Sequence, residues 1–406
     1  MKILHLSYSD RGGAAKAALR LCIAQRESGL DSSLLVFRKT TSYPFVESYA
    51  TSKTKITNLV KIITSKFILD FFNVNKGYYS SLNVFPSGLY RKLNAYDIDI
   101  LHIHWINNEM ISIKEICKIK KKIVWTLHDS WAFCGAEHYP RDLNDESFVN
   151  GYKEKGINQY LLKKKCKYFG KINSLIITTP SNWETTCAQK SLVFKGRSIF
   201  TIFNVLDIKI FDIVNKKFAF EILKLNPNKK YILVNGVMDQ RKGGDILIKT
   251  LKCFSSEQKK GLHILVFGAD YEDRLSSIDI PVTFFGQIQS EYMMALLYNA
   301  AHVTAVPSKM ESFGQVASES IACGTPVVAF DCTGLKDVIK HYETGYLAQP
   351  YDWTDFFFGL VAMIENSSQY SSRCREYVIQ NFSKNVIVPQ FNELYFELLN
   401  RHETMH

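Results

Sequence analysis

Short apolar runs alternate with longer amphipathic segments along almost the whole chain. Apolar runs bounded by turn residues are typical of buried strands, and apolar positions spaced three and four residues apart are typical of helices. Alternation of the two indicates parallel sheets covered by helices, so we expect an α/β fold. The predicted strands are Ile3–Ser7, Ser33–Phe37, Ile98–His104, Ile123–Leu127, Leu175–Thr179, Ile199–Phe203, Tyr231–Asn235, His263–Phe267, Val282–Phe285, Val303–Pro307 and Pro326–Phe330. The predicted helices are Ala14–Ser28, Gly244–Phe254, Ser290–Asn299 and Phe313–Ala322.

The chain has 406 residues, more than one hydrophobic core usually organises, so we expect two domains. Polar and extended residues mix in Asn204–Asn228, which predicts the boundary. We therefore predict an N-terminal domain at 1–205 and a C-terminal domain at 206–384. A final helix at about 385–406 is a candidate to pack back on the N-terminal domain.

One segment, residues 40–95, fits this alternation poorly. Within it, Leu59–Phe72 is apolar over most of its helical circumference and is interrupted by lysines. Two interpretations stay open for Leu59–Arg91, a membrane-interface segment and a helix packed on the N-terminal domain.

The composition narrows the class of protein. The chain contains no run of about 20 apolar residues, and Met1–Ser7 lacks the features of a signal peptide, so we expect a cytoplasmic protein. Nine cysteines without regular spacing indicate reduced thiols, and no pair has zinc-ligand spacing. We expect no metal and no cofactor.

Charge is distributed unevenly between the two halves. Residues 1–205 carry 30 lysines and arginines against 16 aspartates and glutamates, a net charge of +14, whereas residues 206–406 carry 20 against 23, a net charge of −3. A basic half indicates an anionic membrane, a nucleic acid or a phosphorylated substrate as partner, or a set of solvated lysines. No nucleic-acid-binding module with interleaved aromatic and basic residues is present, so nucleic acid is not expected.

Residues with candidate binding or catalytic roles follow predicted strands in both halves of the chain. Gly12 and Gly13 come after the first strand and allow a ligand to approach the backbone at a helix start. His128 comes at the carboxyl end of another strand, the edge at which open parallel sheets bind ligands. In the second half, Arg241 and Lys242 stand in a glycine-bearing loop, Val234–Asp245, that suits a diphosphate.

A last motif follows the strand Val303–Pro307. Glu311 precedes Phe313 and Gly314, and Glu319 lies two turns further on the helix expected to begin there. Backbone N–H groups near Gly314 can bind a phosphate or sugar oxygen, and a carboxylate accepts two hydrogen bonds from sugar hydroxyls.

These motifs resemble glycosyltransferase family 4, retaining enzymes of the GT-B fold, in which two Rossmann-like domains face each other across a cleft. The family pattern of two glutamates separated by seven residues stands here as Glu311–Glu319, and Gly324, Thr325 and Pro326 continue it. Gly345–Leu347 is similar to the family's later turn. One departure is that the family's Gly-Arg pair is missing, since Val237 follows Gly236.

The resemblance implies a retaining, metal-independent glycosyltransferase that uses a nucleotide-diphosphate sugar as co-substrate. It implies catalytic roles for His128, Lys242 and Glu311. The donor-binding residues that it implies are Gly12, Gly13, Arg241, Lys242, Glu311, Ser312, Phe313, Gly314, Gln315 and Glu319.

Thr126–Trp131 with Cys134 and Gly135 resembles members from bacterial surface-polysaccharide clusters. The expected acceptor is therefore a glycan or a lipid-linked sugar in O-antigen, capsule or exopolysaccharide synthesis, at the anionic inner leaflet of the plasma membrane. Alternative hypotheses are a nucleotide-sugar epimerase or hydrolase of the same fold, and a non-catalytic nucleotide-sugar-binding protein.

Overall fold

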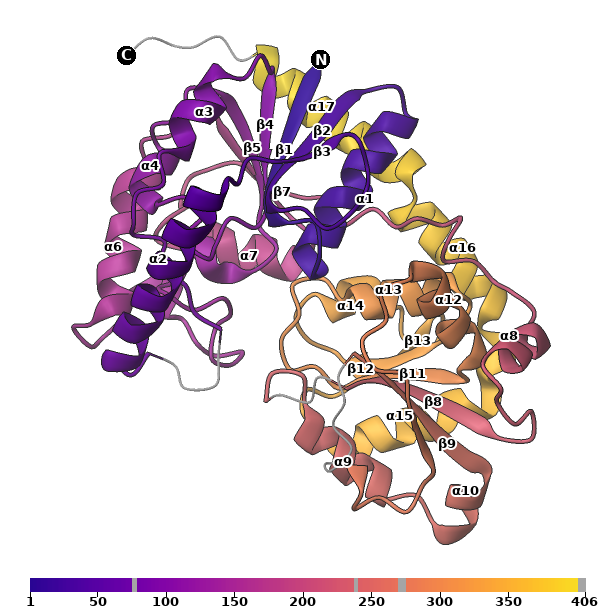
Figure 1. Ribbon diagram of the computed structural model, residues 1–406. Coiled ribbons are helices and arrows are strands. Elements are labelled where there is room, and N and C mark those ends of the chain that lie inside the picture. Colours follow the sequence, from indigo (N-terminus) through magenta and orange to yellow (C-terminus); the bar gives the residue numbers. More distant parts are fainter. Residues whose placement is uncertain (75–78, 237–239, 269–274, 401–406) are drawn as a thin grey trace. The chain divides into compact units, whose positions relative to one another are not determined.

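The computed structural model describes residues 1–74, 79–236, 240–268 and 275–400, and the chain forms two compact units (Figure 1). Unit 1 comprises Met1–Val205 with Lys384–His406, and unit 2 comprises Leu206–Ser383. Each unit is a parallel sheet flanked by helices, which confirms the prediction of two Rossmann-like α/β domains. No helix among these residues is long and apolar enough to cross a membrane.

Unit 1 contains a parallel sheet with the strand order β3-β2-β1-β4-β5-β6-β7. Its strands are β1 (Lys2–Ser9), β2 (Asp31–Arg38), β3 (Val46–Ser48), β4 (Ile100–Ile103), β5 (Lys122–Thr126), β6 (Leu175–Thr179) and β7 (Ile199–Thr201). Its helices are α1 (Gly13–Glu27), α2 (Ser52–Phe71), α3 (Leu89–Ala95), α4 (Ile113–Ile116), η1 (Ser130–Ala132), α5 (Ser147–Asn150), α6 (Ile157–Phe169), α7 (Asn182–Lys190) and α17 (Lys384–Asn400).

The two faces of this sheet are covered by different helices because successive strand residues point to opposite sides. One face contributes Ile3, Ile100, Val124 and Ile176 to a core shared with α17, which contacts α1 and β5 (Figure 1). Their strand neighbours, among them Leu101 and Ile177, join a larger core on the other face. Polar residues two or four positions after the first set lie on the same face and therefore point toward α17. These residues are His5, His102, His104, Thr126 and Thr178.

Unit 2 contains a parallel sheet with the strand order β10-β9-β8-β11-β12-β13. Its strands are β8 (Lys230–Asn235), β9 (Leu262–Phe267), β10 (Val282–Phe284), β11 (Val303–Val306), β12 (Val327–Phe330) and β13 (Gly345–Ala348). Its helices are α8 (Lys216–Ile222), α9 (Gly244–Lys252), α10 (Ser256–Gly261), α12 (Glu291–Ala300), α13 (Gln315–Ala322), α14 (Leu335–Val338), α15 (Trp353–Asn366), η2 (Ser367–Gln369) and α16 (Ser371–Phe382).

Two local predictions need correction. Gly345–Leu347, expected as a turn, belongs to strand β13 beside β12, where a Cβ on Gly345 would lie 2.0 Å from the Val327 carbonyl oxygen. The helix expected from Phe313 begins only at Gln315, because Gly314 takes a left-handed conformation. The predicted boundary segment Asn204–Asn228 contains the junction between the units, at Val205 and Leu206, and also helix α8, whose Ala219 and Phe220 are buried.

Candidate active site

In unit 2, the loops that follow the neighbouring strands β8 and β11 are joined by a backbone hydrogen bond and by a side-chain hydrogen bond of Arg241. The Lys309 N–H donates to the Arg241 carbonyl oxygen at 2.8 Å, and Arg241 Nη1 donates to the Met310 carbonyl oxygen at 3.0 Å. Both loops lie at the carboxyl edge of the sheet, where β8 pairs directly with β11. Part of the predicted diphosphate loop, residues 237–239 with Val237, lies outside the described residues.

Gly243 permits this close approach of the two loops. Its φ is +70°, and a Cβ at this position would lie 2.0 Å from the Pro307 carbonyl oxygen. Only glycine tolerates both the left-handed backbone and the contact. The glycine after Lys242 therefore has a packing role that fixes where Lys242 points.

Glu311 lies between the two cations of the other loop. Lys242 Nζ makes a short ion pair with Glu311 Oε1, and Arg241 Nη1 lies 3.8 Å from Glu311 Oε2. Burial alone raises the pKa of Glu311, but Lys242, Arg241 and a hydrogen bond from Ser308 bring this pKa below its ordinary value. Glu311 is therefore ionised at neutral pH and orients both cations.

Helix α13 starts beside this ion cluster. Gly314, with φ +103°, is its N-cap, and the Gly334 N–H donates to the Glu311 carbonyl oxygen at 2.8 Å. The first N–H groups of a helix and the positive end of its dipole favour an anion. Two cations and a helix start at one sheet edge can therefore neutralise a diphosphate.

The other predicted donor residues of unit 2 occupy different environments. Glu319 is buried in α13 and accepts a 2.9 Å hydrogen bond from the Tyr298 hydroxyl. Phe313 is buried with its ring 5.5 Å from that of Phe382, and Ser312 is also buried. Gln315 is partly exposed at the first position of α13. The structure thus groups Arg241, Lys242, Glu311 and Gly314, and directs Glu319 toward α12.

In unit 1, Gly12 and Gly13 form the start of α1. Gly12 is the N-cap with φ +97°, and neither glycine has an atom within 4 Å of the position a Cβ would take. The preceding Asp10 accepts hydrogen bonds from the backbone and hydroxyl groups of Thr40 and Thr41. These bonds hold the loop while the two glycines remain approachable.

His128 ends a chain of buried histidines. His128 Nε2 lies 2.9 Å from His104 Nδ1, and His104 Nε2 lies 2.8 Å from His5 Nδ1. His5 Nε2 in turn lies 2.8 Å from Gln25 Oε1, on α1. His128 itself is partly exposed, so the chain runs from the interior of unit 1 to its surface.

The chain of contacts fixes the tautomer of each ring. Gln25 Oε1 can only accept, so His5 carries its proton on Nε2 and its Nδ1 must accept. His104 therefore donates from Nε2, and its Nδ1 accepts from the Nε2–H of His128. Neutral His128 is left with an unprotonated Nδ1. The Gln25 amide is oriented by Tyr395 of α17, whose hydroxyl accepts from Gln25 Nε2 at 3.0 Å.

Burial keeps these rings neutral. It lowers the pKa of His5 and of His128 to about 4, and it lowers the pKa of His104 and of His102 still more clearly below the ordinary 6.5. The ligand atoms of His5, His102 and His104 lie within 4.8 Å of one another, a spacing at which a metal could be considered. Each ring nitrogen instead has a hydrogen-bonding neighbour, with Tyr395 and Thr126 on the two sides of His102, so the group is a hydrogen-bond relay.

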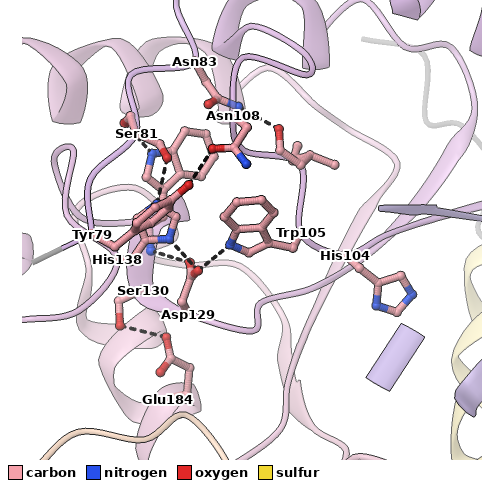
Figure 2. Close-up of polar contacts among 12 residues, drawn as sticks. Tyr79, Ser81, Asn83, His104, Trp105, Asn108, Asp129, Ser130, His138 and Glu184 are labelled. Atoms are coloured by element: carbon pink, nitrogen blue, oxygen red, sulfur yellow. Dashed lines mark hydrogen bonds and ion pairs between the residues drawn. The ribbon is translucent and has the colours of Figure 1, made fainter. Parts of the chain in front are cut away.

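A second polar cluster surrounds Asp129, the residue after His128. Figure 2 shows Trp105 and His138 on two sides of the Asp129 carboxylate, with Tyr79 above His138. Asp129 Oδ2 accepts from Trp105 Nε1 at 2.8 Å and lies 2.6 Å from His138 Nδ1, and His138 Nε2 lies 2.9 Å from Ser81 Oγ. Burial raises the pKa of Asp129, but His138 and these donors bring it below its ordinary value.

The sequence did not single out several residues of these clusters. Gln25 and Tyr395 are separated from His128 by more than one hundred positions, and only the tertiary contacts join them. The spacing of His102 and His104 in a strand was a usable signal, because residues two apart share a face. Nothing in the sequence marks His138 as a partner of Asp129.

Two Rossmann-like units with a cationic loop at the sheet edge of the second define the class of GT-B proteins. Residues 215–381 match the family described as "Glycosyl transferases group 1", so the chain carries a domain of this kind.

Two bacterial enzymes are among the relatives that match this chain. A D-inositol 3-phosphate glycosyltransferase of Rhodococcus erythropolis is 31% identical over 177 residues, which cover 40% of this chain and 40% of that protein. The chain thus spans less than half of this relative's length in the match. An N-acetyl-alpha-D-glucosaminyl L-malate synthase of Bacillus anthracis is 24% identical over 323 residues, 75% of this chain and 76% of the relative.

Solved structures share the whole fold. A sucrose-phosphate synthase from Thermosynechococcus elongatus has a TM-score of 0.71 at 18% identity, covering 99% of this chain and 100% of that one. The Anabaena protein HepE in complex with UDP has a TM-score of 0.64 at 17% identity, covering 98% and 100%. At these identities the likeness establishes the GT-B fold.

Proposed function

We propose that this protein is a retaining, metal-independent glycosyltransferase that transfers a sugar from a nucleotide-diphosphate sugar. The observation that carries the proposal is the cluster of Arg241, Lys242 and Glu311 beside Gly314 at the start of α13. The glycosyl transferases group 1 domain contains this cluster, and the UDP complex of HepE supports a nucleotide-diphosphate ligand for this fold.

In this proposal the diphosphate binds beside Lys242, Arg241 and the N–H groups that follow Gly314. The bond between the anomeric carbon and the diphosphate oxygen breaks, and the negative charge gathers on the departing diphosphate. Groups already oriented toward that charge stabilise the transition state more than the ground state. Glu311 keeps the two cations in place and offers its oxygens to sugar hydroxyls. Glu319 is assigned to the ribose.

The acceptor hydroxyl attacks the anomeric carbon on the face that the diphosphate leaves, and its proton passes to the departing phosphate oxygen. The configuration is thereby retained without a carboxylate nucleophile. A glycosidase-like mechanism would need two carboxyl groups facing each other across the bond, whereas Glu319 is bonded to Tyr298 inside the unit.

His128 acts in this scheme as a hydrogen-bond acceptor. Its Nε2 proton is used toward His104, which leaves Nδ1 to accept from a sugar hydroxyl. A pKa of about 4 makes it a poor proton donor at neutral pH. We therefore assign His128 to binding the donor sugar and the acceptor, and Gly12 and Gly13 to close contact with the substrates.

We further propose a glycan or lipid-linked acceptor in bacterial O-antigen, capsule or exopolysaccharide synthesis, with the protein peripheral on the inner face of the plasma membrane. The net charge of +14 in residues 1–205 supports an anionic surface as partner.

Two variants test the donor site. Lys242→Ala and Glu311→Ala should each lower transfer by about 100-fold or more. The first variant loses a preoriented cation at the leaving oxygen, and the second loses the carboxylate that holds Lys242 and Arg241 in place. Lys260→Ala is the matched control, because Lys260 forms an exposed pair with Glu257 on α10. Near-normal transfer by both site variants, in proteins that melt like the wild type, would overturn the assignment.

Product analysis separates this function from its alternatives. A transferase consumes a nucleotide sugar in proportion to a glycosylated acceptor and gives a product with the donor's anomeric configuration. Donor turnover without acceptor would indicate an epimerase or hydrolase. Tight nucleotide binding with no turnover across an acceptor panel would indicate a binding protein.

A further inference from the structure

Helix α2 carries a largely apolar face that no other described part of unit 1 covers. Large apolar side chains recur along it at intervals of three and four residues, so they share one side of the helix. Phe67 and Phe71 are 70% and 72% exposed, more than most apolar residues of the chain. The exposed members of this set, which we name the α2 face, are Ile56, Leu59, Val60, Ile63, Phe67 and Phe71.

The opposite side of α2 is held on unit 1 by hydrogen bonds and by a buried leucine. The helix is therefore firmly packed, and its exposed apolar side does not result from poor packing. Asn58 Nδ2 donates to the Asn108 carbonyl oxygen at 2.9 Å, and Ser65 Oγ donates to Glu109 Oε1 at 2.7 Å. Leu69 is buried on the same side. A cavity of about 700 Å³ also lies against α2, and none of the α2 face lines it.

The charges of α2 suit an anionic partner. The helix contains Lys53, Lys55, Lys61 and Lys66 against a single acidic residue, Asp70. Asp70 is exposed and lies on the α2 face three residues after Phe67, so the lysines still outnumber acid around this face. Lys55 and Lys66 are exposed, and helical spacing places both at one border of the α2 face. Lysines at the border of an apolar face can extend to lipid phosphates while their alkyl stems lie on apolar surface.

We propose that the α2 face docks on an anionic lipid surface, with α2 lying in the plane of the interface. Exposed phenylalanines insert between the acyl chains and the border lysines pair with lipid phosphates. A protein partner would need no such enrichment of lysine over acid around the apolar face. The proposal deepens the proposed function by assigning the membrane contact to one element, and it rests on that function only for the identity of the acceptor.

Vesicle flotation of the full-length protein tests the proposal. Vesicles of phosphatidylcholine with about 30% phosphatidylglycerol should capture the wild type at low salt, and pure phosphatidylcholine should capture much less. Phe67→Ser together with Phe71→Ser should weaken capture by about tenfold or more. Phe358→Ser is the matched control, because Phe358 is 61% exposed on α15 of unit 2.

A second pair of variants separates charge from insertion. Lys55→Glu together with Lys66→Glu should abolish the preference for phosphatidylglycerol. If the protein ignores anionic vesicles at low salt, or if the phenylalanine variants bind like the wild type, the proposal is wrong. Light scattering that finds a dimer disrupted by Phe67→Ser and Phe71→Ser, without vesicle binding, would assign the α2 face to a second copy and also overturn it.

The proposed function is tested separately by UDP binding in the absence of vesicles. Retained UDP binding with failed flotation refutes only the membrane contact. Flotation without UDP binding refutes the donor site and leaves the α2 face intact.

Discussion

The buried histidine relay predicts that unit 1 loses stability in mild acid. His5 is fully buried and its pKa is about 4, whereas an unfolded histidine titrates at its ordinary 6.5. A histidine whose folded pKa is lowered binds fewer protons when folded, so its contribution is complete above 6.5 and is lost as the pH falls toward 4. The relevant window is therefore the mildly acidic range.

The size of the effect follows from these values. Between about pH 7.5 and about pH 5.5, the unfolded His5 takes up nearly one proton and the folded His5 almost none, which costs about 1 kcal/mol. Burial also lowers the pKa of His102 and of His104 well below 6.5, so both add to the loss in the same direction. A loss of more than about 1 kcal/mol is a sizeable share of the stability of a typical domain.

Urea unfolding monitored by tryptophan fluorescence measures this loss. Trp105, Trp125, Trp131 and Trp183 all lie in unit 1, so the signal reports mainly on that unit. Buried Glu109 and Glu137 have raised pKa values and act in the opposite direction, so the comparison must include a variant.

His5→Phe removes one member of the relay and should reduce the pH-dependent loss by about 1 kcal/mol, even though the variant is less stable at neutral pH. His341→Asn, an exposed histidine of unit 2, should leave the loss unchanged. A loss below about 1 kcal/mol in the wild type, or the same loss in His5→Phe, would show that the buried histidines do not control the acid sensitivity of unit 1.

Two further substitutions test the loops of the two units. Gly243→Ala should lower the melting temperature of unit 2 and weaken UDP binding, because a left-handed alanine costs about 1–2 kcal/mol even without its contact with the Pro307 carbonyl oxygen. Calorimetry measures the melting temperature and titration with UDP measures binding. Unchanged values would show that the close contact between the two loops is not required. Asp129→Asn should destabilise unit 1 by about 2–3 kcal/mol, since the donors Trp105 and His138 lose a charged acceptor. Urea unfolding at neutral pH measures this change in the free energy of unfolding. A change below about 1 kcal/mol would show that the hydrogen bonds to Asp129 do not stabilise unit 1.

Much of the fold could be predicted because parallel strands are buried on both faces and stand out as apolar runs. Leu175–Thr179 was predicted with the bounds of β6, and the other predicted strands differ from the observed ones mainly at their ends. β3 and β13 were missed. β3 has only three residues, two of them exposed, and β13 begins with a glycine whose role depends on its contact with Val327.

The candidate site was predictable where its charged residues stand in loops that directly follow predicted strands. Lys242 and Glu311 were singled out separately from sequence, and the structure joins them in one ion pair. The partners of His128 could not be found in this way, because they depend on tertiary contacts. Tyr395, which orients Gln25 and His102, reaches them only because α17 packs on the sheet of unit 1. The state of His128 therefore depends on contacts that no local pattern encodes.

A crystal structure of the protein with a bound nucleotide diphosphate would test the proposed donor site most directly. Both phosphates are expected beside Lys242 and the first N–H groups after Gly314, with Glu311 still in contact with Lys242. Phosphates bound at any other place in unit 2, or in unit 1 alone, would contradict it.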